Sequence, residues 1–164
     1  MAEMTHRAAV LSRYIKDLID ANKGTIGIEH GLTPKVVRYG DQRTHRDVPS
    51  VCVEPGRLVR ELRGVPFQYD NSIAIPIMLY HTGKDGVETI QEELDNLTED
   101  LAEFLNFESL AELYGGNRLN GLVQNGVVAT IDYGYTVLND RLMRCNRAIW
   151  MGQSMTRVVE AVNG

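Results

Sequence analysis

The segment that most constrains this fold runs from about residue 86 to 107, where apolar residues recur every three or four positions. The pattern Asp85 to Glu88 ahead of it is that of a capping box. The recurring apolar residues are Val87, Ile90, Leu94, Leu97, Leu101, Phe104 and Leu105. This spacing predicts an α-helix of about six turns over 86–107, with one narrow apolar face that must be buried.

The same segment is strongly acidic. Ten acidic residues and no Lys or Arg lie between Asp85 and Glu112, whereas the rest of the chain holds all 17 Lys and Arg residues and is net positive. We therefore expect the outer face of the helix, with Glu92, Asp95, Glu99 and Glu103, to be negative and the remaining surface to be mildly positive.

A second helix is predicted near the start of the chain. Its apolar face consists of Leu11, Tyr14, Ile15, Leu18 and Ile19. Thr5 is a suitable N-cap, and Gly24 is expected to end a helix that covers about 5–21. The following segment, 22–47, is rich in Gly and has only short apolar patches. It is expected to be a long loop with one short strand.

From Val48 onward, alternating apolar residues predict strands. Two short strands are expected on either side of Pro55-Gly56, followed by a turn at 69–72 and a third strand along 73–79. Because Pro76 has no N–H, this strand is either an edge or has its missing donor turned away from its partner. Two further strands are expected at 122–135 and 141–156, with a turn at 138–140 and a bulge at Asn125-Gly126.

These elements predict one α+β domain over all 164 residues, with a mostly antiparallel sheet of about five strands and two helices packed on one face. The last strand is apolar on both sides: Met143, Cys145, Ile149 and Met151 alternate with Leu142, Ala148 and Trp150. Because both helices are expected on one face of the sheet, no predicted element of the same chain would cover the second apolar face. We expect part of it to be buried against another subunit.

The sequence predicts no catalytic residues, cofactor or metal. Gly83-Lys84 is followed by Asp85 and so does not form a phosphate-binding loop, and adjacent acidic residues on a helix do not face one another. The four histidines lack ligand spacing, and Cys52 and Cys145 are expected to be buried thiols. The longest apolar run, 73–80, is too short for a membrane span, and the first residues lack a secretory pattern, so we expect a cytoplasmic protein.

Arginines are the best candidates for an interface. With a pI near 5.4 and no interleaved aromatic residues, they are not expected to bind nucleic acid sequence-specifically, and charge matching to a protein partner is favoured. Trp150 has two open interpretations, a core residue or an interface anchor. The candidate interface residues are Arg38, Arg43, Arg46, Arg57, Arg60, Arg63 and Trp150.

Several stretches, taken in order, resemble the tail-terminator proteins of long-tailed bacteriophages. The resemblance covers about 48–158, and its order and spacing carry more weight than any single motif. The matching stretches are PSVCVEPGR at 49–57, RELRGV at 60–65, MLYH at 78–81, the acidic helix, GLV at 121–123, GY at 134–135 and RAIWMGQS at 147–154.

This resemblance implies a virion protein that assembles in the host cytoplasm as a ring, expected to be a homohexamer, on the last ring of the tail tube. There it would stop tube polymerisation and present a surface to neck or head-completion proteins, and to the sheath if the tail is contractile. DNA would pass through the ring without sequence-specific recognition. The acidic helix would lie at the outer wall or the subunit seam, and Arg57, Arg60 and Arg63 on a contact surface. The alternatives are another head-tail connector, such as a stopper or tail-completion protein, or a small enzyme.

Overall fold

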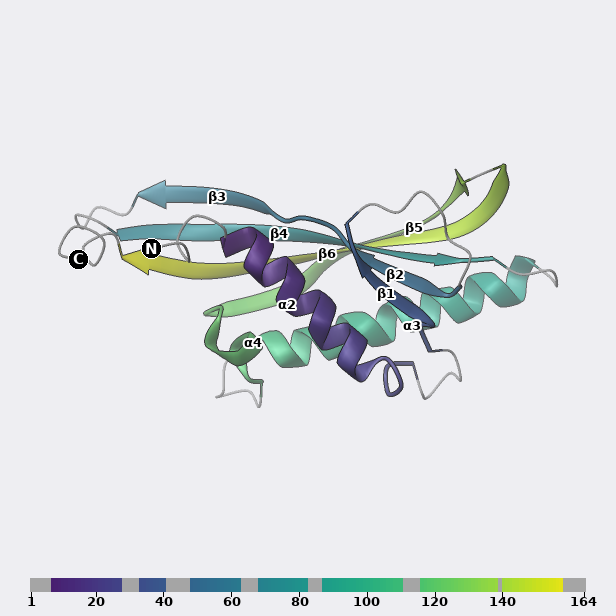
Figure 1. Ribbon diagram of the computed structural model, residues 1–164, viewed down its shortest axis with the longest axis horizontal. Helices are drawn as coiled ribbons and strands as arrows, with labels where there is room; N and C mark the ends of the chain where they lie inside the picture. Colours follow the sequence, from purple (N-terminus) through teal and green to yellow (C-terminus); the bar gives the residue numbers. More distant parts are fainter. Residues whose placement is uncertain are drawn as a thin grey trace.

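The computed structural model describes residues 7–27, 33–40, 48–62, 68–82, 87–110, 116–138 and 140–157. It is an α+β fold with a mostly antiparallel sheet, as the sequence predicts, and the sheet has six strands where about five were expected (Figure 1). The elements in chain order are α2 (Arg7–Asn22), β1 (Val36–Tyr39), β2 (Ser50–Val53), β3 (Arg57–Leu62), β4 (Gln68–His81), α3 (Val87–Ser109), α4 (Arg118–Gly121), β5 (Asn125–Leu138) and β6 (Arg141–Arg157).

The sheet has the strand order β1-β2-β4-β6-β5. β3 pairs with the first half of β4, along the same edge of β4 that pairs with β2 further on. All described pairings are antiparallel except that of β1 with β2. The sixth strand, β1, is the short strand expected within the loop over 22–47. The tight turn expected at 138–140 is confirmed, because Leu138 of β5 pairs with Arg141 of β6.

Pro76 lies in a central strand, so the prediction of an edge strand is wrong. The second alternative is the one observed. Pro76 faces Ile149 of β6, and its carbonyl accepts a hydrogen bond from the Glu54 N–H at 2.9 Å on the other side. The N–H and C=O of a strand residue point to the same side. The missing N–H of Pro76 would therefore face the gap between the end of β2 and the start of β3, where neither strand pairs with β4.

Two further predictions about this sheet are corrected. The turn expected at 69–72 is part of β4, which begins at Gln68 because β3 and β6 both pair with this polar stretch. The bulge is not at Asn125-Gly126, which starts β5, but between Val128 and Thr130. Long-range pairing thus overrides the local turn propensity of polar residues.

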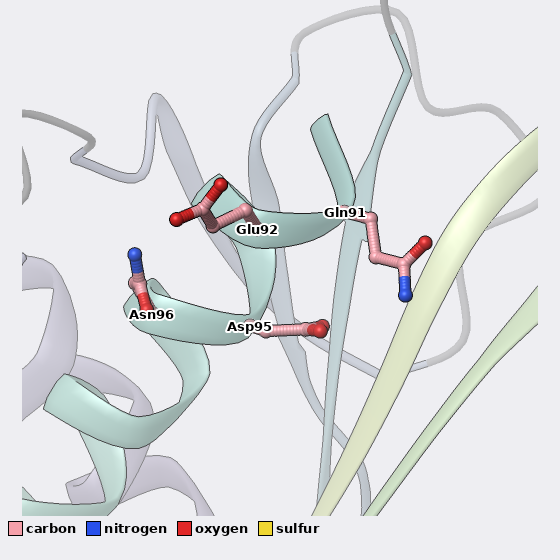
Figure 2. Close-up of a pocket in the computed structure, with 4 residues that line it drawn as sticks. All are labelled: Gln91, Glu92, Asp95 and Asn96. Atoms are coloured by element: carbon pink, nitrogen blue, oxygen red, sulfur yellow. The ribbon is translucent and has the colours of Figure 1, made fainter. Parts of the chain in front are cut away.

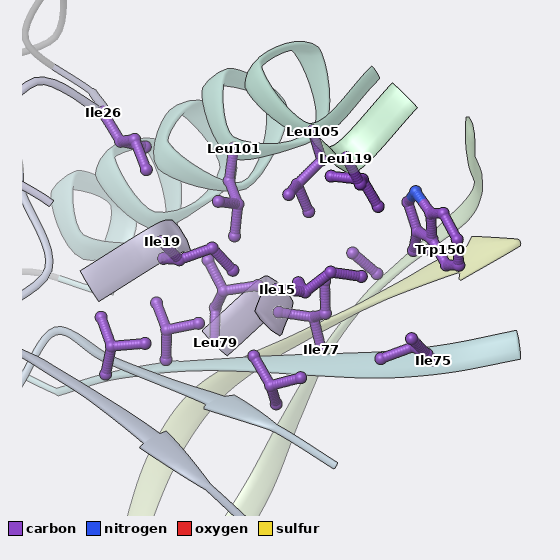
Figure 3. Close-up of a cluster of buried hydrophobic side chains, with 14 of the residues drawn as sticks. Ile15, Ile19, Ile26, Ile75, Ile77, Leu79, Leu101, Leu105, Leu119 and Trp150 are labelled. Atoms are coloured by element: carbon purple, nitrogen blue, oxygen red, sulfur yellow. The ribbon is translucent and has the colours of Figure 1, made fainter. Parts of the chain in front are cut away.

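Both long helices pack on one face of the sheet, as predicted. Their apolar faces meet the odd-numbered residues of β4, and Figure 3 shows these side chains converging with Leu119 and Trp150. The expected helix over 86–107 is α3, and the expected helix over 5–21 is α2. Thr5 and the Asp85 cap lie outside the described residues. The central buried residues are Leu11, Ile15, Ile19, Ile73, Ile75, Ile77, Leu79, Leu94, Leu97, Leu101, Leu105 and Trp150.

The second face of the sheet has its own small cluster. Cys52, Tyr80 and Met143 are buried there, and Val48, Met78 and Cys145 pack against them. The expectation that this face has no internal use is therefore wrong for one part of it. The other part keeps Val59, Val127 and Met151 exposed. Among the described helices, none combines the length and the hydropathy that crossing a bilayer requires.

Candidate functional site

A buried polar network joins α3 to β6 beneath the β5–β6 hairpin. Arg144 is only 7% exposed, and its Nη2 donates to both carboxylate oxygens of Asp95 at 3.1 Å. The Asn146 amide donates to Asp95 at 2.8 Å and to the Thr98 hydroxyl at 3.0 Å. These charge-assisted bonds offset the cost of burying Arg144 and of partly burying Asp95.

Two tyrosines of β5 extend this polar contact along the helix. The Tyr133 hydroxyl donates to Glu99 and the Tyr135 hydroxyl to Gln91, each at 3.1 Å. The Arg144 guanidinium lies 4.8 Å from the centroid of the Tyr135 ring, within cation–π range. Burial raises the pKa of Tyr133 and the hydrogen bond to Glu99 raises it further, so the phenol remains a donor at neutral pH.

The position of Asp95 corrects the predicted acidic outer face. Glu92, Glu99 and Glu103 are exposed as expected, but Asp95 is turned towards the sheet and paired with Arg144. No helical periodicity could reveal this, because the partner lies 49 residues later in the chain. The signal in the sequence was the position of Arg144 and Asn146 on the face of β6 that also carries Leu142, Ala148 and Trp150.

An open depression lies beside this network. It is lined by Gln91, Glu92, Asp95 and Asn96 of α3. Figure 2 shows Gln91 and Asp95 extending towards the hairpin strands, while Glu92 and Asn96 project from the other side of the helix. Arg144 and Asn146 together donate three hydrogen bonds to the Asp95 carboxylate from β6. Within the described ranges, no cluster of His, Cys, Asp or Glu could hold a metal.

We expect the substitution Arg144→Met to lower the free energy of unfolding by about 1–3 kcal/mol, because Asp95 loses charge-assisted bonds while it stays largely covered. The loss should be below that of a fully buried pair, since the Asp95 side chain is 26% exposed. Urea denaturation followed by circular dichroism measures it. The matched control is Arg141→Met, an exposed site on the same strand that should change stability by less than about 0.5 kcal/mol. Equal losses in the two variants would contradict this role of the ion pair.

The arginines predicted as interface residues do not form one described cluster. Arg57 and Arg60 are both exposed, but strand alternation places them on opposite faces of β3, so they cannot act as one contact. Arg38 lies on β1, a different edge of the sheet. Arg43, Arg46 and Arg63 lie outside the described residues.

Trp150 is a core residue, which decides between its two interpretations. Its side chain is completely buried, and its indole N–H donates to the Ser109 hydroxyl at 2.7 Å. The cysteines are both free thiols; Cys52 is buried as predicted, and Cys145 is only partly buried. Burial raises the pKa of Cys145, and a hydrogen bond with Tyr80 lowers it in part.

Exposed large apolar side chains gather on the β5–β6 hairpin, and sequence reasoning did not single out their positions on β5. Tyr133, Tyr135 and Val137 are 45%, 48% and 65% exposed, and Leu142 on the paired strand is 62% exposed. The hairpin end extends past the other strands (Figure 1). Exposed apolar residues on a sheet edge are typical of a surface that is covered by another chain.

Comparison of the sequence with models of known protein families gave no match, and comparison with curated proteins gave no significant match.

Proposed function

We propose that this chain is a structural subunit of a long-tailed phage virion. It caps the head-proximal end of the tail tube as a homohexameric ring, stops tube polymerisation and provides the attachment surface for a neck or head-completion protein. The order of sequence stretches that resemble tail terminators is the starting point for this proposal. The fold supports it, because a sheet with both helices on one face leaves the other face and the edges for contacts between subunits.

The observation that carries the proposal is the exposed apolar surface of the hairpin. A long edge strand with exposed Tyr133, Tyr135 and Val137 is a liability for an isolated protein, since open edges recruit other strands. In a permanent assembly the same surface supplies the apolar contacts, while charges set the orientation. The exposed carboxylates of α3 and the exposed Arg57 on the helix-free face of β3 place charges of opposite sign on different parts of the subunit.

The partners follow from the place of a terminator in the particle. One side of the ring meets the tail tube protein and the other the neck protein, with the sheath at the rim if the tail is contractile. DNA passes through the ring without sequence-specific contacts. Arg57 is exposed on the helix-free face of β3, where it is suited to a contact between rings.

The proposal is tested by deleting the gene and imaging the particles that accumulate. Loss of a terminator should leave tail tubes longer than normal and without heads, and supplying the intact gene in trans should restore the normal length. Headless tails of normal length would instead indicate a stopper or tail-completion protein. Complete particles with normal tails would overturn the virion role.

A further inference from the structure

The two end strands of the sheet are unequal. In the described part of the chain, β5 pairs only with β6 and β1 only with β2, so each presents one open edge. β5 is 14 residues long and contains no Pro, Lys or Arg; its one charged residue is Asp132. Natural edge strands are usually short or protected by charges and Pro. Such an edge is suited to pairing with another strand.

The register of the sheet aligns the two edges. Residues that face one another from strand to strand form a row on the helix-free face that begins at Arg38 of β1 and ends at Asp132 of β5. The residues between them in this row are Cys52, Met78 and Arg147. On the helix-covered face, the adjacent row runs from Tyr39 to Ile131, and the one on its other side runs from Val37 to Tyr133. The sheet thus ends in a cation at one edge and an anion at the other, at the same level.

The strand directions also match. β1 and β2 are parallel, and each following pairing is antiparallel, so β1 and β5 run in opposite directions. A second copy placed beside the first in the same orientation would therefore add its β1 to β5 as an antiparallel ladder. β3 is less suited than β1 to pair with β5 of a neighbour. It is level with only the first residues of β5, and the N–H of Val128, next to these residues, already donates to Asn106 at 2.6 Å.

The helices carry a second complementary pair. At the β1 edge, the Arg13 guanidinium of α2 lies 5.1 Å from the centroid of the Tyr39 ring. At the β5 edge, Glu99 of α3 accepts the hydrogen bond from Tyr133. Copies arranged side by side would bring the cationic edge of α2 towards the anionic edge of α3. Unlike charges would then meet on both faces of the sheet, and desolvation at the contact would strengthen their attraction.

We propose that β5 of one copy of this chain pairs antiparallel with β1 of a second copy, with Asp132 beside Arg38 of the neighbour on one face and Glu99 near its Arg13 on the other. The inference rests on the proposed ring and specifies the contact that closes it. The contact joins two different surfaces, so repetition produces a ring or an open fibre rather than a twofold dimer. A twofold pairing of two β5 strands centred on Asp132 is disfavoured, because it would place Asp132 opposite the same residue of the neighbour.

The test uses charge reversal on the full-length chain and reads molecular mass by sedimentation equilibrium. Arg38→Asp and Asp132→Arg, each alone, should sediment as monomers at concentrations where the unchanged protein is a ring. Mixing the two variants in equal amounts should restore the ring mass, because every contact in an alternating ring then joins opposite charges. The double variant should also assemble. Circular dichroism melts establish that each variant is folded, and a single variant that is unfolded is replaced by Arg13→Glu or Glu99→Arg, paired in the same way.

The matched control is Glu61→Arg on β3, an exposed carboxylate outside the aligned rows, which should leave the ring intact. Single variants that keep the ring mass, or folded variants that do not reassemble when mixed, would overturn this contact. Either result leaves the tail phenotype of the gene deletion, and with it the proposed function, unaffected. Conversely, the mixed variants could reassemble while the tails remain normal after gene deletion. That combination would support the contact and contradict the terminator role.

Discussion

The substitution Trp150→Ala is expected to lower the free energy of unfolding by about 3–5 kcal/mol. The side chain is completely buried between the sheet and the end of α3, and its N–H donates to the Ser109 hydroxyl. Two glycines leave the space that the indole fills. A Cβ at Gly152 would lie 2.1 Å from the indole Cη2, and one at Gly126 would lie 2.3 Å from Cζ2. Removing the ring therefore opens a cavity, because neither glycine has a side chain that could fill it.

Urea denaturation followed by far-ultraviolet circular dichroism measures this loss, since Trp150 is the only tryptophan and its fluorescence would disappear with it. Trp150→Phe is the informative control. It keeps most of the apolar volume and removes the hydrogen bond, so its loss should be well below that of Trp150→Ala. A loss below about 1 kcal/mol for Trp150→Ala would contradict a core position for this residue.

The second large effect is expected at the apolar face of α3. Leu97→Ala or Leu101→Ala should each cost about 2–5 kcal/mol, because the two side chains are 0% and 1% exposed and hold the helix to the sheet. Leu142→Ala is the matched control: the same deletion at a side chain that is 62% exposed should change stability by less than about 0.5 kcal/mol. Similar denaturation midpoints for Leu97→Ala and Leu142→Ala would mean that the buried face of the helix is misassigned.

Much of the fold could be predicted because it depends on local periodicity. The repeat from Leu94 to Leu105 predicted α3, and the alternation from Ile73 to Leu79 predicted the buried face of β4. Both patterns arise from the geometry of a single element, which requires one face to be apolar wherever the element packs. The α+β class followed from the order of these elements.

The candidate site could be predicted only in part. The charge separation between the acidic helix and the rest of the chain was visible in the sequence, as were Arg38 and Arg57 as candidate contact residues. The opposite faces of Arg57 and Arg60 follow from strand alternation, but the alignment of Arg38 with Asp132 does not, because only the pairing of five strands places these two residues at the same level. Register across a sheet depends on contacts between residues distant in the chain, and composition carries no record of it.

What the sequence by itself determined about this protein is therefore the set of elements and their apolar faces, since each needs only neighbours within a few positions. The tertiary structure alone decided the places where polar residues behave as core. Asn71 is 1% exposed within a stretch that has the composition of a turn, because strands on both sides pair with it. Asp95 points towards the sheet and not towards solvent, because the buried Arg144 needs a counter-charge. Removing one partner of a fully buried ion pair costs on the order of 3–5 kcal/mol.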